Sequence, residues 1–202
     1  MARYTGPKNK LARKIGEDLG LKSNALKVAK RLTSRPGQHG AKGRRKVSDY
    51  GVQLKEKQKV KFMYGIQEKQ MRRLYDMATK TPTGTGNALL ALLERRIDNV
   101  VYRMGWAPTR AAARQLVNHG NVLLNSKKMS IPSYKVLIND VLTLKPKATT
   151  IPVVSALLKE EGYVAPEWLE RKGPAGKIAR FPQREDIKEV IEEQLIVEFY
   201  SR

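Results

Sequence analysis

The sequence contains no cysteine, and this absence excludes several kinds of site at once. Disulfides, thiolate zinc sites and cysteine nucleophiles all need the missing sulfur. Histidine is also scarce, since only His39 and His119 are present, so a histidine-ligated metal site is not expected. No apolar run approaches the roughly 20 residues of a membrane span, and the first ten residues lack the apolar segment of a signal peptide. The sequence predicts a soluble intracellular protein that needs neither a metal nor another cofactor.

Acidic residues are few relative to basic ones. The 202 residues include 40 Lys and Arg against 19 Asp and Glu, and the formal net charge is +21. Residues 1–50 hold 14 basic and 3 acidic side chains, whereas residues 151–202 hold 8 basic and 10 acidic ones. This imbalance favours nucleic acid as the partner, because Lys and Arg that neutralise phosphates release condensed counterions. An anionic membrane surface is the alternative, but it usually recruits one basic amphipathic helix rather than charge dispersed over most of a chain.

The first 50 residues have few apolar side chains and are predicted to form an extension rather than part of a core. A short helix is possible at 25–32. In the segment 34–46, Pro36 and three glycines prevent a regular element. This segment is either a disordered basic linker or a segment that orders along RNA phosphates. If it orders, its candidate RNA contacts are Arg35, His39, Arg44, Arg45 and Lys46.

Two helices are predicted between residues 48 and 78. Ser48 and Asp49 are good N-cap residues for the first, and residues 66 (or 68) to 78 carry the apolar spacing of the second. Four lysines of the first helix recur at spacings of two, which places them on two opposite sides. They could contact phosphates on both flanks, although a solvated face explains the same pattern. These lysines are Lys55, Lys57, Lys59 and Lys61. Residues 79–86 are predicted to be a hinge.

Residues 89–120 predict two helices joined by a tight turn. An apolar stripe from Leu93 to Met104 indicates one continuous helix that ends at Gly105, and Thr109 is placed to cap the next helix. Polar side chains follow the opposite sides of both helices: Arg96, Asn99 and Arg103 on the first, and Arg110, Arg114 and Asn118 on the second. Guanidinium groups and a helix N-terminus at one surface suit phosphates, although an arginine face is often only solvated.

After Gly120 the apolar period changes to two. Strands are predicted at 122–124, 129–131, 136–138 and 141–144, with Lys127 and Lys128 near a hairpin tip that could reach a groove. Helices are predicted at 152–161 and 186–200, and Trp168 is expected to anchor a loop. Trp106 and Trp168 are interpreted as core residues rather than as platforms for base stacking.

Four blocks of the sequence closely resemble bacterial small-subunit ribosomal protein four: residues 36–40 (PGQHG), 48–54 (SDYGVQL), 89–120 and 196–201 (IVEFYS). The resemblance runs from Met1 to Arg202. It implies an α+β fold with a basic RNA-tracking extension at 1–47. It also implies a mainly helical domain at 48–92, completed by a C-terminal helix at about 184–202. An α/β domain at 93–175 is inserted into this helical domain. The inserted domain holds an RNA-binding module, a helix-turn-helix with a small antiparallel sheet, at about 95–156.

The resemblance implies a primary binder of small-subunit rRNA that docks early on a helix junction of the 5′ domain and nucleates assembly. It places the protein in the cytoplasm, in the small ribosomal subunit near the mRNA entry path, with a contribution to decoding accuracy. The implied partners are small-subunit rRNA, ribosomal proteins three and five of that subunit, and mRNA. The residues carried over to the recognition region of the module are Arg96, Arg103, Thr109, Arg110, Arg114, Gln115 and His119. We expect Arg110 and Arg114 to support RNA binding more than stability.

Two departures from the family pattern change local expectations. Many relatives hold zinc with four N-terminal cysteines, so the extension of this chain should be organised by RNA contacts instead. Removal of residues 1–46 should leave a folded remainder, because that segment has too few apolar residues to form part of a core. The family's hairpin usually has Asn-Gly where this chain has Asn125-Ser126, which leaves the turn type open.

Enzymes are the first alternative, because the same module occurs in pseudouridine synthases, tyrosyl-tRNA synthetases and RNA methyltransferases. Each of these needs a separate catalytic domain, and no Ser/His/Asp set or metal-ligand set can be assembled here. We therefore predict no catalytic residue. A free RNA-binding regulator that represses translation is the other alternative.

Overall fold

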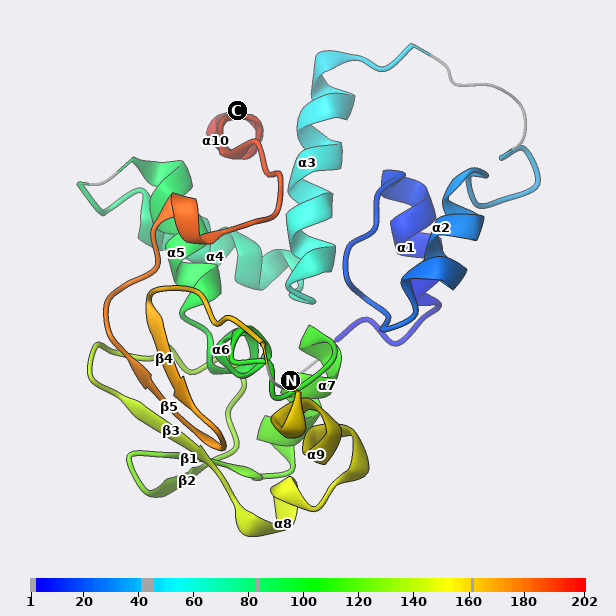
Figure 1. Ribbon diagram of the computed structural model, residues 1–202. Helices are drawn as coiled ribbons and strands as arrows, with labels where there is room; N and C mark the ends of the chain where they lie inside the picture. The colour runs from blue at the N-terminus through cyan, green and yellow to red at the C-terminus, as the bar shows by residue number, and fades with distance from the viewer. Residues whose placement is uncertain (1–2, 41–45, 83, 161) are drawn as a thin grey trace. The chain divides into compact units, whose positions relative to one another are not determined.

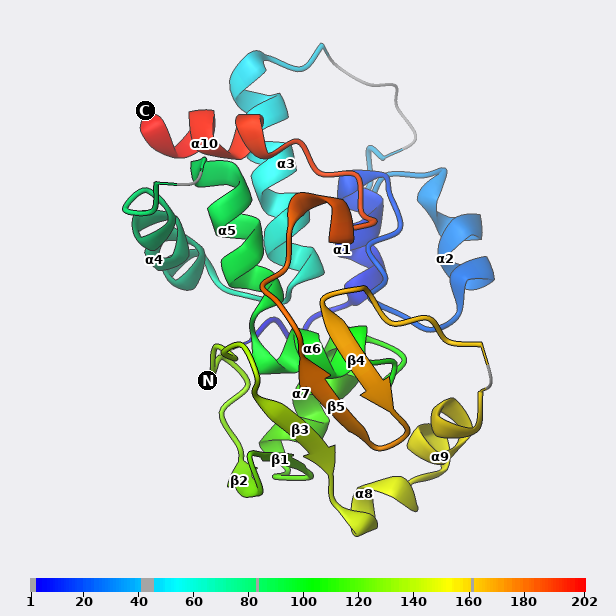
Figure 2. The same cartoon turned by 60° about the vertical axis from the view of Figure 1, so that its left-hand side comes forward.

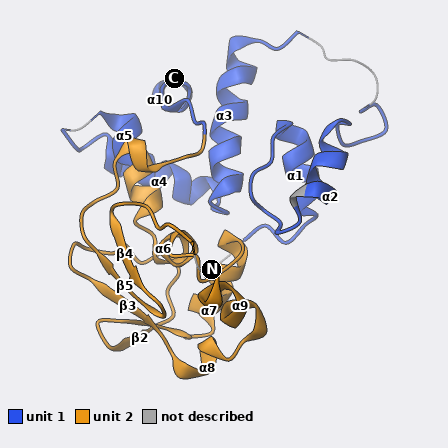
Figure 3. Cartoon of the chain, viewed as in Figure 1, with its two compact units in different colours: residues 1–89, 190–202 blue, residues 90–189 orange. Residues whose placement is uncertain are grey.

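The computed structural model describes residues 3–40, 46–82, 84–160 and 162–202. It divides into two compact units, one of residues 1–89 and 190–202 and one of residues 90–189 (Figures 1 and 3). Unit 1, as we call the first, is helical, and unit 2 combines helices with an antiparallel sheet. The predicted α+β class is thus confirmed. None of the helices in the described ranges combines the length and the hydropathy needed to span a membrane.

Unit 1 is built from helices on both sides of the inserted sequence. Its helices are α1 (Lys8–Ile15), α2 (Ala25–Leu32), α3 (Asp49–Met63), α4 (Glu68–Ala78) and α10 (Glu193–Ser201), and α5 (Thr85–Glu94) runs across the boundary between the units. The Ser48 hydroxyl accepts a hydrogen bond from the backbone N–H of Gly51 at 3.3 Å, so the predicted cap of α3 is confirmed. Helix α10 packs against α3 (Figures 1 and 2), and Gln53 donates to Glu198 across this contact at 2.8 Å.

The N-terminal extension contributes to the packing of unit 1. Helix α2 was predicted, but α1 was not, and α1 packs against both α2 and α3. Ala12, Ile15, Leu19 and Val28 are all buried, and Lys59 pairs with Glu17 at 2.7 Å. The expectation that this region lies outside any core is therefore wrong. An amphipathic helix needs only one narrow apolar side to dock, because its long basic side chains extend outward into solvent.

Unit 2 has one core between its helices and its sheet. The helices are α6 (Ile97–Arg103), α7 (Arg110–Asn118), α8 (Pro146–Thr149) and α9 (Pro152–Lys159). The strands are β1 (Val122–Leu124), β2 (Lys127–Met129), β3 (Val141–Leu144), β4 (Leu169–Lys172) and β5 (Ala175–Ile178). The sheet has the order β2-β1-β3-β5-β4 and is antiparallel throughout. Trp106 and Trp168 are fully buried in this core, as predicted.

The sheet differs from the predicted strands in three places. Strand β2 begins two residues earlier than expected. Residues 136–138 do not form a strand, and next to them Lys135 forms only an isolated bridge with Arg96. Strands β4 and β5 form a hairpin where a loop was predicted, and Figure 2 shows β5 beside β3. The hairpin turns at Gly173, whose φ of +56° suits glycine, and charged residues in β4 hide the alternating pattern.

Two predicted helices are interrupted. The helix expected to run through 89–104 breaks at Arg96, whose backbone is extended (ψ 135°), and α6 then starts at Ile97. The backbone N–H of Ile97 donates to Tyr134 O at 2.9 Å instead of to a helical carbonyl. At the C-terminus, residues 187–192 are not helical and α10 begins only at Glu193. The stripe from Leu93 to Met104 is correct as a set of buried positions, whereas in the C-terminal stripe Ile187 and Ile191 are buried but Val190 is exposed. Burial alone does not require a continuous helix.

The hairpin between β1 and β2 has a type I′ turn. Asn125 and Ser126 have φ values of +48° and +67°, so both lie in the left-handed region that this turn requires. The Asn125 amide holds the turn in place, because it donates to Asp140 at 2.8 Å and accepts from the backbone N–H of Val141 at 2.9 Å. These contacts allow the turn to form although Ser126 replaces the glycine that usually occupies its second position.

Candidate nucleic-acid interface

Helices α6 and α7 pack together as a helix-turn-helix in unit 2. Gly105 turns the chain after α6 with a φ of +69°, and the Thr109 hydroxyl accepts a hydrogen bond from the backbone N–H of Ala112 at 3.2 Å. The predicted turn and cap are therefore confirmed. Thr109 itself is buried, so its hydroxyl serves the helix rather than an exposed surface.

The four arginines predicted to face RNA on this motif are buried, and their surface placement is wrong. The exposed fractions are 3% for Arg96, 8% for Arg103, 9% for Arg110 and 5% for Arg114. The helical period correctly puts these side chains opposite the apolar stripe. It does not reveal what covers that side, and here the cover consists of the carboxylates of Glu94, Asp98 and Glu189.

Two carboxylates hold Arg103 and Arg110. Glu94, at the end of α5, accepts two hydrogen bonds from Arg103, at 2.9 and 2.7 Å. Glu189 accepts one from Arg103 at 2.6 Å and one from Arg110 at 2.8 Å. Asn99 closes the network, because it accepts from Arg110 at 2.8 Å and donates to Glu94 at 2.7 Å. Paired, charge-assisted hydrogen bonds of this kind satisfy guanidinium groups that burial would otherwise destabilise.

A single carboxylate, that of Asp98, holds the other two arginines. Asp98 accepts two hydrogen bonds from Arg96, at 3.0 and 2.7 Å, and one of its oxygens lies 3.8 Å from an Nη1 nitrogen of Arg114. All three side chains are buried. The motif therefore carries most of its positive charge inside the fold, where it orders α6 and α7.

The electrostatics of Glu189 match this geometry. Burial by itself would raise the pKa of Glu189. The positive charges of Arg103 and Arg110 and their hydrogen bonds outweigh burial and lower the pKa to about 2. Glu189 is therefore ionised at neutral pH and links two helices to the chain segment that leads to α10.

The remaining candidates of unit 2 do lie at its surface. Gln115 and Asn118 are exposed on α7, His119 is exposed directly after it, and Lys127 and Lys128 are exposed on β2, an edge strand of the sheet. The structure brings the two groups together at Gly120, where the aliphatic part of Lys128 occupies the space that a Cβ atom would need. This exposed set contains two lysines and three neutral polar side chains, which can contact phosphate and base edges.

The lysines predicted along α3 do not share one environment. Lys57 and Lys59 are buried and paired, Lys57 with Glu68 at 2.8 Å and Lys59 with Glu17 at 2.7 Å. The expectation that they are exposed on the flanks of α3 is wrong, because side chains of α1, α4 and α10 pack around α3. Lys61 is half-buried and also pairs with Glu68, at 3.0 Å. Only Lys55 of this set is exposed.

The candidates before α3 are mostly at the surface. Arg35, His39 and Lys46 are exposed, whereas Arg44 and Arg45 lie outside the described residues. Within the described part of the chain, no group of three or more metal-ligating side chains could hold a metal ion.

Sequence reasoning missed the carboxylates that organise unit 2. Glu94, Asp98 and Glu189 were not assigned to the arginines, although Glu94 and Asp98 lie four residues apart beside Arg95 and Arg96. That close spacing of acidic and basic residues could have predicted ion pairs between them. Glu189 has no such signal, since it lies 79 residues after Arg110 and is one of ten acidic residues in the C-terminal quarter.

Comparisons with known proteins cover the same elements. Residues 3–94 match the family described as ribosomal protein S4/S9 N-terminal domain, and residues 95–142 match the S4 domain. The second match includes α6, α7, β1 and β2, and thus the helix-turn-helix and the exposed lysines of the hairpin.

Relatives match over their entire length. The chain is 47% identical to the small ribosomal subunit protein uS4 of Chloroflexus aurantiacus, 46% to that of Parabacteroides distasonis and 50% to that of Herpetosiphon aurantiacus. In each case the alignment covers 100% of both chains.

Proposed function

The chain belongs to the family of small ribosomal subunit protein uS4, and we propose on this premise that it is a structural protein of the small ribosomal subunit that binds rRNA. The observation that carries the proposal is the full-length match to relatives that bear this name. The net charge of +21 supports it, because binding of a polyanion offsets the repulsion among so many cations.

The exposed polar groups of unit 2 supply one RNA-binding surface in this proposal. We define the hairpin surface as Gln115, Asn118, His119, Lys127 and Lys128, all of which are exposed. Lysine ammonium groups contact phosphates, and the amide and imidazole groups can donate to bases or to ribose. The buried arginines shape this surface indirectly by ordering α6 and α7.

The finer role follows from the family alone. We propose that the protein docks early on the 5′ domain of the small-subunit rRNA, nucleates assembly and lies near the mRNA entry path of the cytoplasmic ribosome. We further propose that it contributes to decoding accuracy there. Its protein neighbours in this proposal are ribosomal proteins three and five of the small subunit, and mRNA is a further partner.

Cross-linking of the purified full chain to small-subunit rRNA, with mapping of the linked sites, tests the proposal. We expect links from the hairpin surface to one contiguous rRNA region, and an affinity that falls steeply with salt, as about 5–10 phosphate contacts require. An affinity that is unchanged between low and moderate salt would contradict the electrostatic account. Links scattered over unrelated RNA would contradict a specific ribosomal role and favour a general RNA-binding regulator.

A further inference from the structure

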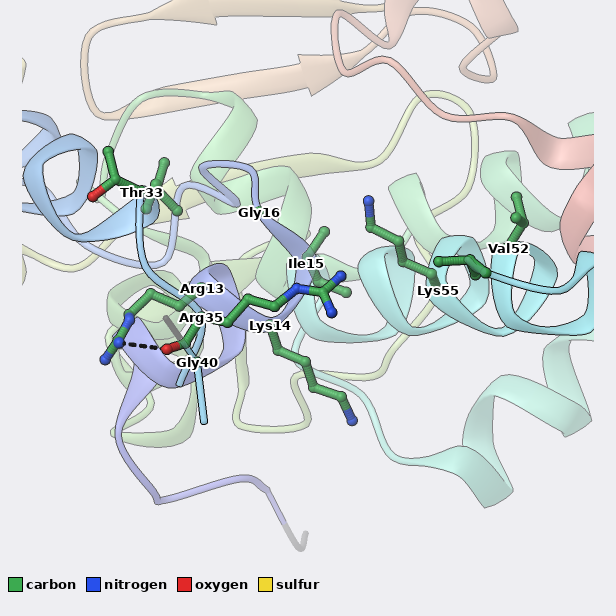
Figure 4. A pocket seen from close by; sticks show the side chains of 11 residues that line it. Arg13, Lys14, Ile15, Gly16, Thr33, Arg35, Gly40, Val52 and Lys55 are labelled. Atoms are coloured by element: carbon green, nitrogen blue, oxygen red, sulfur yellow. Dashed lines mark hydrogen bonds between the residues drawn. The ribbon is translucent and has the colours of Figure 1, made fainter. Parts of the chain in front are cut away.

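Unit 1 contains a cleft whose charged side chains are all basic among the described residues that line it. The cleft has a volume of about 360 Å³ and lies between α1, residues 32–40 and the start of α3 (Figure 4). Its cationic residues are Arg13, Lys14, Arg35 and Lys55. They come from three separate chain segments, so the fold brings them together.

Arg13 differs from the other three because its guanidinium is already engaged. Its Nε donates to Ser34 O at 2.7 Å and its Nη2 donates to Arg35 O at 2.8 Å, which Figure 4 shows for Arg35. This fork fixes the backbone from which the Arg35 side chain projects. Arg13 is thus a positioning residue for Arg35.

The other three cations have no counter-charge within the described residues. Neither ammonium group of Lys14 and Lys55 forms an ion pair there, and the Arg35 guanidinium forms none. In the view of Figure 4 the Arg35 guanidinium lies between the ends of Lys14 and Lys55. Lys57 and Lys59, two and four residues beyond Lys55, each have a carboxylate partner. Like charges that line one cleft without a carboxylate repel one another, and an anion in the cleft would reduce this repulsion.

We infer that this cleft is a binding site for one phosphate group, held by Lys14, Arg35 and Lys55 and shaped by Arg13. The planar guanidinium of Arg35 can donate two hydrogen bonds to a phosphate, and the two lysines add point charges from opposite sides. A bound phosphate would connect α1, residues 32–40 and α3. Assignment of that phosphate to the RNA backbone rests on the proposed function, whereas the site itself also admits free pyrophosphate.

Calorimetric titration of the full chain with sodium pyrophosphate at constant ionic strength tests the site without RNA. The variant Lys14→Gln/Lys55→Gln removes two cleft cations, and Lys27→Gln/Lys30→Gln removes two exposed cations of α2 that do not line the cleft. We expect the cleft variant to bind pyrophosphate at least about tenfold more weakly than the wild type, and the α2 variant to bind like the wild type. Equal losses in both variants would overturn the inference, because they would show attraction by diffuse charge only.

The variant Arg13→Lys separates geometry from charge. Lysine keeps the positive charge but cannot donate to Ser34 O and Arg35 O together. We expect a roughly tenfold loss of pyrophosphate affinity with an unchanged dependence on salt, because the number of charges is the same. Full affinity in this variant would overturn the positioning role of Arg13.

A small-subunit rRNA fragment then distinguishes the two sources of phosphate. Displacement of pyrophosphate by the RNA would identify an RNA phosphate as the occupant. Retention of pyrophosphate while the RNA binds would overturn the RNA assignment and leave a site for free phosphates. Failure of the wild type to bind rRNA at all, with pyrophosphate bound, would contradict the proposed function and not the site.

Discussion

The carboxylate of Glu189 lies 2.6 Å from the Nη2 nitrogen of Arg103, although 86 residues separate them in the chain. Its other oxygen accepts from Arg110 at 2.8 Å, so one side chain ties α6 and α7 to the segment that precedes α10. Two arginines that the sequence assigns to RNA are thus paired with a carboxylate of the protein itself.

Replacement of Glu189 should destabilise the protein. We expect Glu189→Gln to lower the free energy of unfolding by about 3 kcal/mol, because it leaves two buried guanidinium groups with one carboxylate fewer. Urea unfolding at neutral pH measures this loss. The control is Lys188→Gln, which changes an exposed neighbour by the same amount of charge and should alter stability by less than about 0.5 kcal/mol. Similar stability of the two variants would show that the network contributes little.

The contribution of Glu189 should disappear in acid. Its pKa is lowered from 4.5 to about 2 in the folded protein, so ionisation favours folding at every pH above the unfolded value. That shift corresponds to about 3 kcal/mol at neutral pH. This stabilisation is complete above about pH 4.5 and is lost as the pH falls toward 2. Melting temperatures of the wild type and Glu189→Gln should therefore converge over this range, and a constant difference would contradict the assignment.

Arg110 and Arg114 should matter more for stability than for direct RNA contact. Because both are buried among carboxylates, the double variant Arg110→Ala/Arg114→Ala should lose about 3 kcal/mol or more of unfolding free energy. The exposed pair on the same helix, Gln115→Ala/Asn118→Ala, should keep its stability and lose rRNA affinity. Thermal unfolding and RNA titration of both variants test this division. Unchanged stability with a loss of rRNA affinity in the arginine variant would show that Arg110 and Arg114 contact the RNA directly.

The lysines of the hairpin should act through phosphates. For Lys127→Gln/Lys128→Gln we expect weaker rRNA binding, and a slope of log affinity against log salt that is shallower by about 1.5. The melting temperature should change little, because both side chains are exposed. An unchanged salt slope would mean that β2 does not contact the RNA backbone.

Glycine should be better than serine at the second turn position. Ser126 has a φ of +67°, which costs a side chain about 1 kcal/mol relative to glycine, so Ser126→Gly should raise stability by about 0.5–1 kcal/mol. The same change at Ser130, which does not have a positive φ, should not stabilise. Thermal unfolding of both variants measures the difference. Equal shifts would show that the turn is not strained.

Much of the architecture could be predicted because it depends on neighbours in the chain. Ser48 and Thr109 cap helices through hydrogen bonds to backbone groups three residues away, so local residue types suffice. The apolar stripe from Leu93 to Met104 predicted buried positions correctly, although Arg96 interrupts the helix through its bridge to Lys135. That bridge joins residues 39 positions apart and has no local signature.

The sequence by itself determined the charge of the protein, the starts of α3 and α7, the buried stripe from Leu93 to Met104 and, through long ordered motifs, its family. Only the tertiary structure decided which cations are free to bind a partner. Lys55 and Lys57 differ by two positions, yet one is exposed and the other is buried against Glu68. Arg110 likewise meets Glu189 only after the chain has folded. Helical periodicity gives the direction of a side chain, but the charge that the side chain meets there comes from segments that are distant in the sequence. The energy of the resulting ion pair depends on the separation of the two charges in space and on their burial.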